Sequence, residues 1–263
     1  MIRTVVTLIL AVLATLVGAV SAIIVSFLTR GGNVAHIVGR LWAKSVLWVS
    51  RVKVTVEGME NIDPTAPYVY MANHQSMFDI LVLLGHLPVQ FRWLAKKELF
   101  RIPIFGYSMA RVGYISIDRS NRRSAIQSLQ MAAKKIAQGV SVVVFPEGTR
   151  SHDGKLKSFK KGGFYLAIDS RQPIVPVVIF GSHEIMPKGT LQIKPGRIVL
   201  SVKPPVKTTL YQRATKEALM ERIWSVMEQD LVRLQASEAE SAQHPASGLT
   251  EDSQRGKGCA RKS

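Results

Sequence analysis

The spacing of hydrophobic positions changes twice along the chain. Residues 4–29 contain no charged side chain, and Arg3 and Arg30 flank this apolar run. In residues 34–50 apolar side chains cover much of a helical surface. Beyond residue 50, short runs rich in Val, Ile, Phe and Tyr alternate with helical patterns. The pattern predicts an apolar N-terminal helix, a second helix and an α/β domain.

Residues 51–235 predict one α/β domain. The expected strands are 52–56, 68–71, 91–94, 114–117, 140–145, 174–180 and 197–202. The expected helices are 77–84, 104–110, 122–138, 163–169 and 216–234. Runs such as VSVVVF and IVPVVIF have no polar alternation, which is typical of parallel strands covered on both faces. We therefore expect an α/β fold with a mostly parallel sheet flanked by helices, and ligands beyond the carboxyl ends of its strands. From residue 236 to 263 the composition turns to Ser, Glu, Gln and Gly and predicts a disordered tail.

Residues 1–33 predict a transmembrane anchor. A helix of 26 residues is about 39 Å long, which exceeds the ~30 Å hydrocarbon core of a bilayer. The alternative is a cleaved signal peptide with a weak cleavage site at Val20-Ser21-Ala22. Apolar regions of signal peptides run to only ~7–15 residues, and here the apolar run continues past that site, which favours the anchor.

Basic residues follow the apolar run more densely than they precede it. Five of them lie within the next 25 positions, namely Arg30, Arg40, Lys44, Arg51 and Lys53. Because positive loops stay in the cytoplasm, we expect the domain on the cytoplasmic face of a membrane, the inner membrane if the cell is bacterial. Residues 34–50, with Trp42 and Trp48, predict an amphipathic helix at the membrane interface, or else a helix packed on the domain.

Composition narrows the classes of partner. The 263 residues are 47% hydrophobic and 20% charged, and the single Cys259 excludes an internal disulfide and a multi-cysteine zinc site. Lys and Arg number 35 against 18 Asp and Glu, a net charge of +17. Fifteen basic and four acidic residues lie between Arg92 and Lys161, whereas residues 236–263 are balanced. The folded part should therefore meet an anion: nucleic acid, a phospholipid surface or a phosphorylated small molecule.

His74 and Asp79 follow the expected strand 68–71. Ser76 and Asp79 have the spacing of a capping box, so a helix should begin after Ser76. Five residues turn through about 140° on an ideal helix, so His74 meets Asp79 only if it lies before the helix and folds back. A histidine held by a carboxylate can act as a general base. An ordinary helix cap beside an ordinary loop histidine explains the same residues equally well.

Basic side chains also follow three other expected strands. Lys96 and Lys97 come after 91–94, and Asp118 and Arg119 after 114–117. Residues 146–151 read PEGTRS, a tight turn whose Gly, hydroxyl and Arg suit a phosphate. Each loop alone is an ordinary basic surface, but together they place several cations at the sheet edge that carries His74.

Other motifs predict little. Ser108 lies in GYSMA, which resembles a nucleophile elbow but ends in Ala and follows no strand, so we expect a structural role. His86, His152 and His183 lack metal-ligand spacing. There is no phosphate-binding G-x-x-x-x-G-K-[ST] and no dinucleotide fingerprint. We therefore expect neither a metal nor a nucleotide cofactor.

Four blocks together resemble the glycerolipid acyltransferases that acylate lysophosphatidic acid. They are His74 with Asp79, GYISIDR (113–119), FPEGTRS (145–151) and VPVVI (175–179). The resemblance covers about residues 48–203. It implies transfer of an acyl group from acyl-CoA or acyl carrier protein to the 2-hydroxyl of lysophosphatidic acid, which gives phosphatidic acid, at a membrane and with no cofactor.

The resemblance also assigns roles. His74 would be the general base and Asp79 its orienting partner. The acceptor phosphate would meet cations at Arg119 and Arg150, joined by Lys96. The backbone of Gly148 and Thr149 would shape that site, and Glu147 would tie the loop structurally.

Three alternatives stay open. An enzyme of the same class could use another acceptor, such as glycerol 3-phosphate or a different lysolipid. A lipid hydrolase could use Ser108. A noncatalytic protein could bind anionic lipid or nucleic acid, although no nucleic-acid motif supports the latter.

Overall fold

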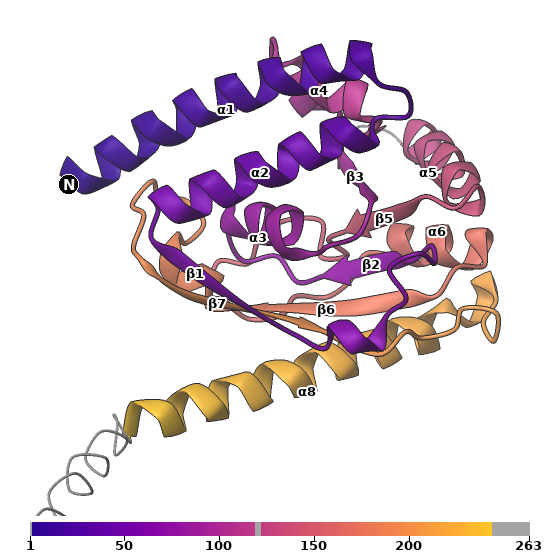
Figure 1. Ribbon diagram of the computed structural model, residues 1–263. Coiled ribbons are helices and arrows are strands. Elements are labelled where there is room, and N and C mark those ends of the chain that lie inside the picture. Colours follow the sequence, from indigo (N-terminus) through magenta and orange to yellow (C-terminus); the bar gives the residue numbers. More distant parts are fainter. Residues whose placement is uncertain (1, 119–121, 244–263) are drawn as a thin grey trace, which may run out of the picture.

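The core of the molecule is one seven-stranded sheet (Figure 1). The structure is a computed structural model that describes residues 2–118 and 122–243. The strands are β1 (Val52–Glu57), β2 (Val69–Ala72), β3 (Phe91–Lys96), β4 (Ile115–Ile117), β5 (Ser141–Val144), β6 (Ile174–Phe180) and β7 (Gly196–Val202). Their order in the sheet is β1-β7-β6-β2-β5-β3-β4. All seven correspond to strands expected from the sequence.

The direction of the strands brings the expected loops together. Neighbouring strands are parallel throughout the sheet, except that β6 and β7 are antiparallel. Strands β2, β3, β4, β5 and β6 therefore all end at one edge. The prediction of a mostly parallel sheet is confirmed. The fully buried strands β2 and β5 form its centre, as their unbroken apolar sequences predicted.

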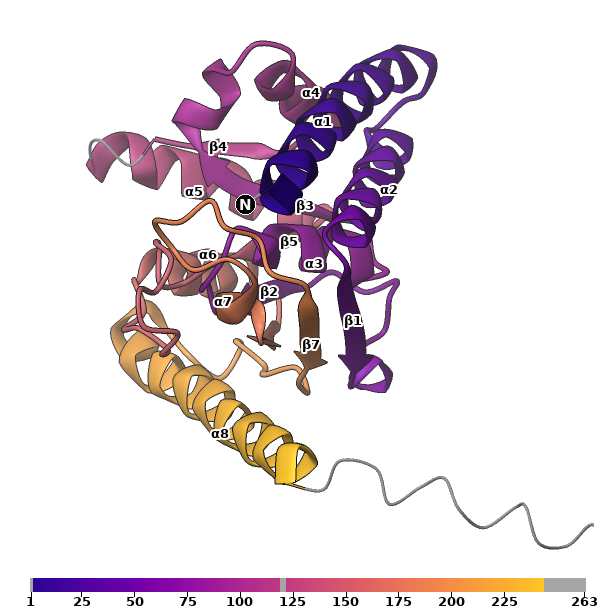
Figure 2. The same cartoon turned by 90° about the vertical axis from the view of Figure 1, so that its left-hand side faces the viewer.

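Helices cover both faces of the sheet (Figures 1 and 2). The helices of the domain are α3 (Phe78–His86), α4 (Phe105–Val112), α5 (Arg122–Ala137), α6 (Gly162–Ser170), α7 (Ser182–Ile185) and α8 (Lys216–Gln243). Short 3-10 turns lie at Met59–Asn61, Lys97–Arg101 and Arg213–Thr215. Helix α3 buries its side chains in one hydrophobic cluster, and α5, α6 and α8 bury theirs in a second cluster across the sheet.

Helix α8 continues further than the sequence predicted. It ends at Gln243, so residues 236–243 are helical rather than disordered. The segment SEAESAQ consists largely of Ala, Glu and Gln, which are strong helix formers and extend an existing helix at little cost. The rest of the expected tail, 244–263, lies outside the described residues.

The N-terminal region forms a pair of helices, α1 (Ile2–Leu28) and α2 (Asn33–Val49), that lie against each other. A Cβ on Gly18 of α1 would come within 3.0 Å of the Trp42 side chain, so this glycine allows the close approach. The Trp42 indole N–H also donates to Thr15 Oγ1 at 3.1 Å. Figure 1 shows the two helices running along one side of the domain.

Both ends of α1 are bonded to the domain. The Arg3 guanidinium donates to the carbonyl of Ile193 at 3.0 Å. At the other end, the Arg111 guanidinium of α4 donates to the hydroxyl and the carbonyl of Ser26, both at 2.9 Å. Helix α1 is long and apolar enough to cross a membrane, yet its two ends contact the same globular domain.

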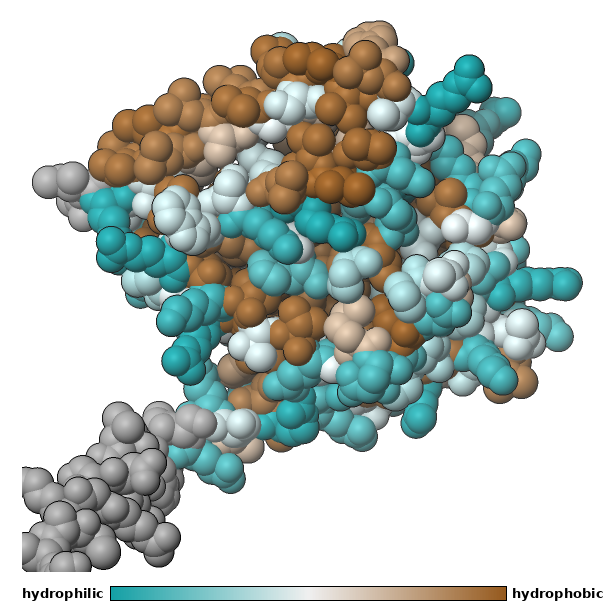
Figure 3. Space-filling view, viewed as in Figure 1, coloured by the Kyte–Doolittle hydropathy of each residue, from teal (hydrophilic) through white to brown (hydrophobic). Residues whose placement is uncertain are grey.

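Helix α2 packs on the domain, which was one of the two placements its sequence allowed. Its residues Ala35, His36, Ala43, Val46 and Leu47 are buried. The Arg40 guanidinium donates to the carbonyls of Leu87 and Val89, which joins α2 to the loop after α3. The opposite face exposes Ile37, Leu41 and Trp48. The apolar surface continues along α1, the long brown band at the top of Figure 3.

Candidate active site

His74 and Asp79 are in direct contact. His74 lies in the loop between β2 and α3, and its Nδ1 is 2.8 Å from Oδ2 of Asp79 in the first turn of α3. Helix α3 begins at Phe78, one residue later than the capping-box spacing predicted, and Met77 is its N-cap. The hydroxyl of Ser76 accepts the N–H of Phe78 at 3.2 Å in the turn just before the helix. His74 thus lies before the helix and folds back onto Asp79, as its spacing required. The histidine side chain keeps 13% of its surface exposed, whereas Asp79 is completely buried.

The contact with Asp79 fixes the proton of the imidazole. Oδ2 of Asp79 also accepts the backbone N–H groups of Gln75 at 2.6 Å and Ser76 at 2.8 Å. Three donors around one oxygen favour an ionised carboxylate, which can only accept. The proton of neutral His74 then lies on Nδ1, and Nε2 keeps a free lone pair, as a general base requires.

The loop after β5 is tied to the loop of His74 by Glu147. Its carboxylate accepts the N–H of His74 at 2.7 Å and the N–H of Lys157 at 3.1 Å. The N–H of Ser151 in turn donates to the carbonyl of His74 at 2.8 Å. Burial raises the pKa of Glu147 to about 7, against the opposing effect of the two N–H donors. Glu147 therefore serves as a buried tie between two loops, as the resemblance implied.

Aromatic rings set the tilt of the imidazole. The ring of His74 stacks on Phe145 with centroids 3.9 Å apart and planes 13° from parallel. Phe145 stacks in turn on Trp93 at 5.6 Å. With Asp79 on Nδ1 and Phe145 on its face, His74 is held on two sides.

Lys96 and Arg150 reach the same cavity as His74. Lys96 is the last residue of β3, and Arg150 follows the turn at Gly148, which has a φ of +72°. Neither forms an ion pair among the described residues. Lys97, by contrast, is bound to Asp118 at 2.7 Å. Arg119, the other expected phosphate ligand, lies outside the described residues.

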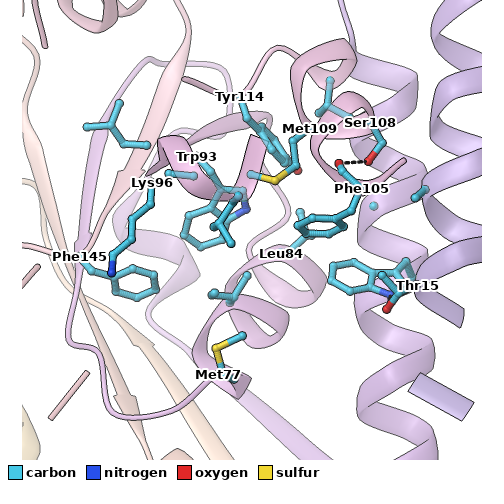
Figure 4. A pocket seen from close by; sticks show the side chains of 18 of the residues that line it. Thr15, Met77, Leu84, Trp93, Lys96, Phe105, Ser108, Met109, Tyr114 and Phe145 are labelled. Carbon is cyan, nitrogen blue, oxygen red and sulfur yellow. Dashed lines mark hydrogen bonds between the residues drawn. The ribbon is translucent and has the colours of Figure 1, made fainter. Parts of the chain in front are cut away.

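The cavity has a volume of about 510 Å³. Its polar end is formed by His74, Gly148, Thr149 and Arg150 with Lys96 and Lys188. Its apolar walls come from α1, α2, α3 and α4, and small side chains leave room between the helices at Gly18, Ala19, Ala22, Ala35 and Gly39. Figure 4 shows the aromatic and aliphatic side chains that surround it, among them Trp93, Phe105 and Tyr114.

Two parts of the site were missed by sequence reasoning. Lys188 lies in the segment between α7 and β7, beyond the β6 end, and its Nζ is 3.2 Å from the carbonyl of Arg150. The sequence placed that segment at the ligand edge, but no motif singled Lys188 out. The small residues of α1 and α2 were part of an apolar pattern, and only helix packing shows that they line a cavity.

Ser108 also lines the cavity, but its hydroxyl donates to the carbonyl of Phe105 at 2.7 Å (Figure 4). No histidine bonds to it among the described residues, so the arrangement of a serine hydrolase is lacking there. In the same part of the chain no group of three or more His, Cys, Asp or Glu side chains is placed to hold a metal ion.

Comparison with known proteins agrees with this geometry. A family model described as Acyltransferase matches residues 53–180. A 1-acyl-sn-glycerol-3-phosphate acyltransferase of Chlamydomonas reinhardtii is 41% identical over 177 residues, which are 65% of this chain and 53% of that protein. The alpha form of the same enzyme from Bos taurus is 35% identical over 196 residues, 74% of this chain and 68% of that protein. The chain thus spans about half the length of the algal relative.

A solved structure is similar over a larger share of the chain. The crystal structure of the lysophosphatidic acid acyltransferase PlsC from Thermotoga maritima superposes with a TM-score of 0.78 at 29% identity. The match covers 89% of this chain and 95% of that one. The coverage and identity of these relatives, together with the His74–Asp79 pair, show that the chain belongs to the 1-acyl-sn-glycerol-3-phosphate acyltransferase family.

Proposed function

We propose that the protein transfers a fatty acyl group from a thioester donor to the 2-hydroxyl of lysophosphatidic acid, and so forms phosphatidic acid. The observation that carries the proposal is the continuity of the cavity. One end holds His74 with three cations, and the rest is lined by apolar helices. The phosphate of the acceptor matches the cationic end of the cavity, and the acyl chain to be transferred matches the apolar part.

His74 acts as the base of the reaction. Its Nε2 takes the proton of the acceptor hydroxyl as the oxygen attacks the thioester carbonyl carbon. The C–O bond forms, the C–S bond breaks, and the proton passes from His74 to the departing thiolate. Asp79 stabilises the imidazolium that exists in between, and general-base assistance of this kind typically contributes about 10²–10⁴-fold. A thioester is already activated, so these steps need no cofactor.

The cations bind the phosphate of the acceptor. Arg150 offers a planar fork, Lys96 a point charge, and Arg119 adds a further cation by resemblance. Gly148 and Thr149 supply the turn between them. Acyl-CoA and acyl carrier protein both present a thioester, so either serves as the donor in this scheme.

The apolar surface of the N-terminal helices supports a position of the site at a membrane. The exposed side chains of α1 are almost all apolar, among them Val5, Ile9, Val12, Leu16, Val17, Ile24 and Phe27. Because Arg3 and Ser26 both bond to the domain, we place α1 within one leaflet, parallel to the surface, rather than across the bilayer. The domain then lies on the face where its cations meet anionic lipid, which is the cytoplasmic face and, in a bacterium, that of the inner membrane.

The test is acyl transfer by the purified protein in mixed micelles. Lysophosphatidate would be offered with labelled oleoyl-CoA and, separately, with palmitoyl-acyl carrier protein. We expect labelled phosphatidate from at least one donor, and none from His74→Ala. A panel with glycerol 3-phosphate and lysophosphatidylcholine identifies the acceptor. If folded protein acylates no lysolipid with either donor, the proposal is wrong.

A further inference from the structure

Lys188 stands at the tip of a turn beside the cavity. The turn runs from Pro187 to Thr190, where the N–H of Thr190 donates to the carbonyl of Pro187 at 3.3 Å. Gly189, at its third position, has a φ of +91°, the conformation that a type II turn requires there. The preceding Met186 is buried, and its carbonyl accepts the hydroxyl of Ser76 at 2.8 Å. The backbone of this turn is therefore fixed to the loop that carries His74.

The ammonium group of Lys188 reaches across to the loop after β5. Its Nζ is 3.4 Å from Oγ1 of Thr149 and 3.2 Å from the carbonyl of Arg150. These are long contacts to neutral oxygens. The structural lysines of the domain behave differently, since Lys97 and Lys203 contact carboxylates at 2.7 and 2.8 Å. Lys188 retains a donor for a ligand and is partnered too weakly to serve only as a tie.

The positive charge at the polar end of the cavity is not balanced by carboxylates. Lys96, Arg150 and Lys188 line it, and none of the three is paired with a carboxylate within the described part of the chain. The two buried carboxylates nearby, Asp79 and Glu147, accept backbone N–H groups. Several cations close together repel one another unless an anion lies between them. The polar end of the cavity therefore suits an anionic group on a substrate.

From this geometry we infer that Lys188 is a substrate-binding residue that holds the phosphate of the acceptor beside Thr149 and Arg150. The inference rests on the proposed acyl transfer. By donating to Oγ1 of Thr149, Lys188 also turns the hydroxyl proton of Thr149 away from itself, so that Thr149 can donate to the same phosphate. A thioester donor that carries phosphates is the other source of such an anion, and the experiment separates the two.

The experiment compares Lys188→Met, Lys188→Arg and the wild-type enzyme in micelles. The matched control is Lys194→Met, which removes an exposed lysine six positions along the same segment, outside the cavity. We expect Lys188→Met to raise the KM for lysophosphatidate by about tenfold to a hundredfold, the usual effect of losing one hydrogen bond to a charged group. The kcat should change much less, Lys188→Arg should recover most of the loss, and Lys194→Met should equal the wild type.

The donor arm repeats the comparison with palmitoyl-CoA and with palmitoyl-N-acetylcysteamine, a thioester without phosphate. If Lys188 binds the acceptor, the loss in Lys188→Met is the same with both donors. A loss that disappears with the phosphate-free thioester overturns the assignment. So does a fall in kcat alone with unchanged KM, or an active wild type that Lys188→Met equals. A wild type that transfers no acyl group to any acceptor refutes the proposed function, and this inference with it.

Discussion

Oδ2 of Asp79 bonds to Nδ1 of His74 and to two backbone N–H groups at once. One oxygen therefore does two kinds of work. It fixes the orientation and tautomer of the His74 imidazole, the proposed base, and it shapes the turn through the N–H groups of Gln75 and Ser76. Holding the imidazole and the two N–H groups needs only an acceptor, whereas stabilising an imidazolium needs a negative charge, so substitutions can separate these effects.

Asp79→Asn should lower kcat far more than stability. An asparagine oxygen can still accept the two N–H groups, but a neutral amide does not stabilise imidazolium. We expect kcat to fall by about 10²–10⁴-fold, the range of general-base assistance. Asp79→Ala should in addition lower the free energy of unfolding by at least about 1–3 kcal/mol, because buried N–H groups lose their partner. The measurements are kcat and chemical denaturation in the same detergent.

Asp230→Asn is the matched control, a buried aspartate of α8 that pairs with Lys203 and Arg233 on the far side of the sheet. It should lower stability and leave kcat unchanged. Equal losses of activity in Asp79→Asn and Asp230→Asn, in proportion to instability, would contradict an orienting role for Asp79.

Glu147 should make the free energy of unfolding fall as pH rises, which is opposite to the effect of a carboxylate with a lowered pKa. Burial raises its pKa to about 7 from an ordinary value of 4.5. Between these two pH values the unfolded chain has released the proton and the folded chain has kept it. The unfolded state then binds fewer protons, so the contribution of Glu147 to stability falls as pH rises from 4.5 to 7 and is level above that.

Glu147→Gln removes this dependence. The difference in unfolding free energy between variant and wild type should therefore shift in favour of the variant as pH rises from 5 to 8, by an amount on the order of 3 kcal/mol at most. Denaturation curves at four pH values give the difference directly, and the other titrating groups cancel in it. A difference that stays flat, or that moves in favour of the wild type, would show that Glu147 is ionised in the fold across this range.

The sequence predicted all seven strands, because runs such as IVPVVIF are apolar enough to be read without tertiary context. The spacing allowed His74 to meet Asp79 only from outside the helix and left an ordinary helix cap equally open, so the contact was predicted by the family resemblance. Sequence reasoning missed Lys188, whose place depends on a turn after α7 that carries no motif. It also missed the cavity between α1, α2 and α4, because whether a glycine opens a space depends on the helix facing it. The predicted end of α8 was wrong for a local reason, because a polar composition does not prevent Ala and Glu from extending a helix.

Gly39 should control the length of acyl chain that the cavity accepts. A Cβ at this position would lie 3.6 Å from Cδ2 of Leu84 and 3.7 Å from the hydroxyl of Tyr114. These are ordinary van der Waals distances, so the Cβ of a new side chain fits there. The larger side chain of Gly39→Leu would fill part of the cavity. Leucine is also a better helix former than glycine by about 1 kcal/mol, so the fold should survive.

We expect Gly39→Leu to lower kcat/KM for palmitoyl-CoA more than for lauroyl-CoA. Each methylene that is no longer buried costs about 0.8 kcal/mol, so the loss of three or more should change the ratio of the two kcat/KM values by at least about tenfold. Leu41→Phe adds volume on the exposed face of the same helix and should leave the ratio unchanged. An unchanged ratio in Gly39→Leu would mean that the chain does not enter between α2 and α3.

The placement of α1 within one leaflet is tested by labelling. Cys259 is the single cysteine, so Cys259→Ser gives a background without thiols. In that background Thr4→Cys and Arg30→Cys place one thiol near each end of α1 and leave the Arg3 and Ser26 bonds to the domain intact. Because Arg3 and Ser26 both contact the catalytic domain, we expect an impermeant maleimide added on the domain side of sealed vesicles to label both positions. Labelling of Arg30→Cys alone from that side, with Thr4→Cys reached only from the lumen, would show instead that α1 crosses the bilayer. Lys194→Cys, an exposed position of the domain near Ile193, reports in parallel that the domain side is open to the reagent.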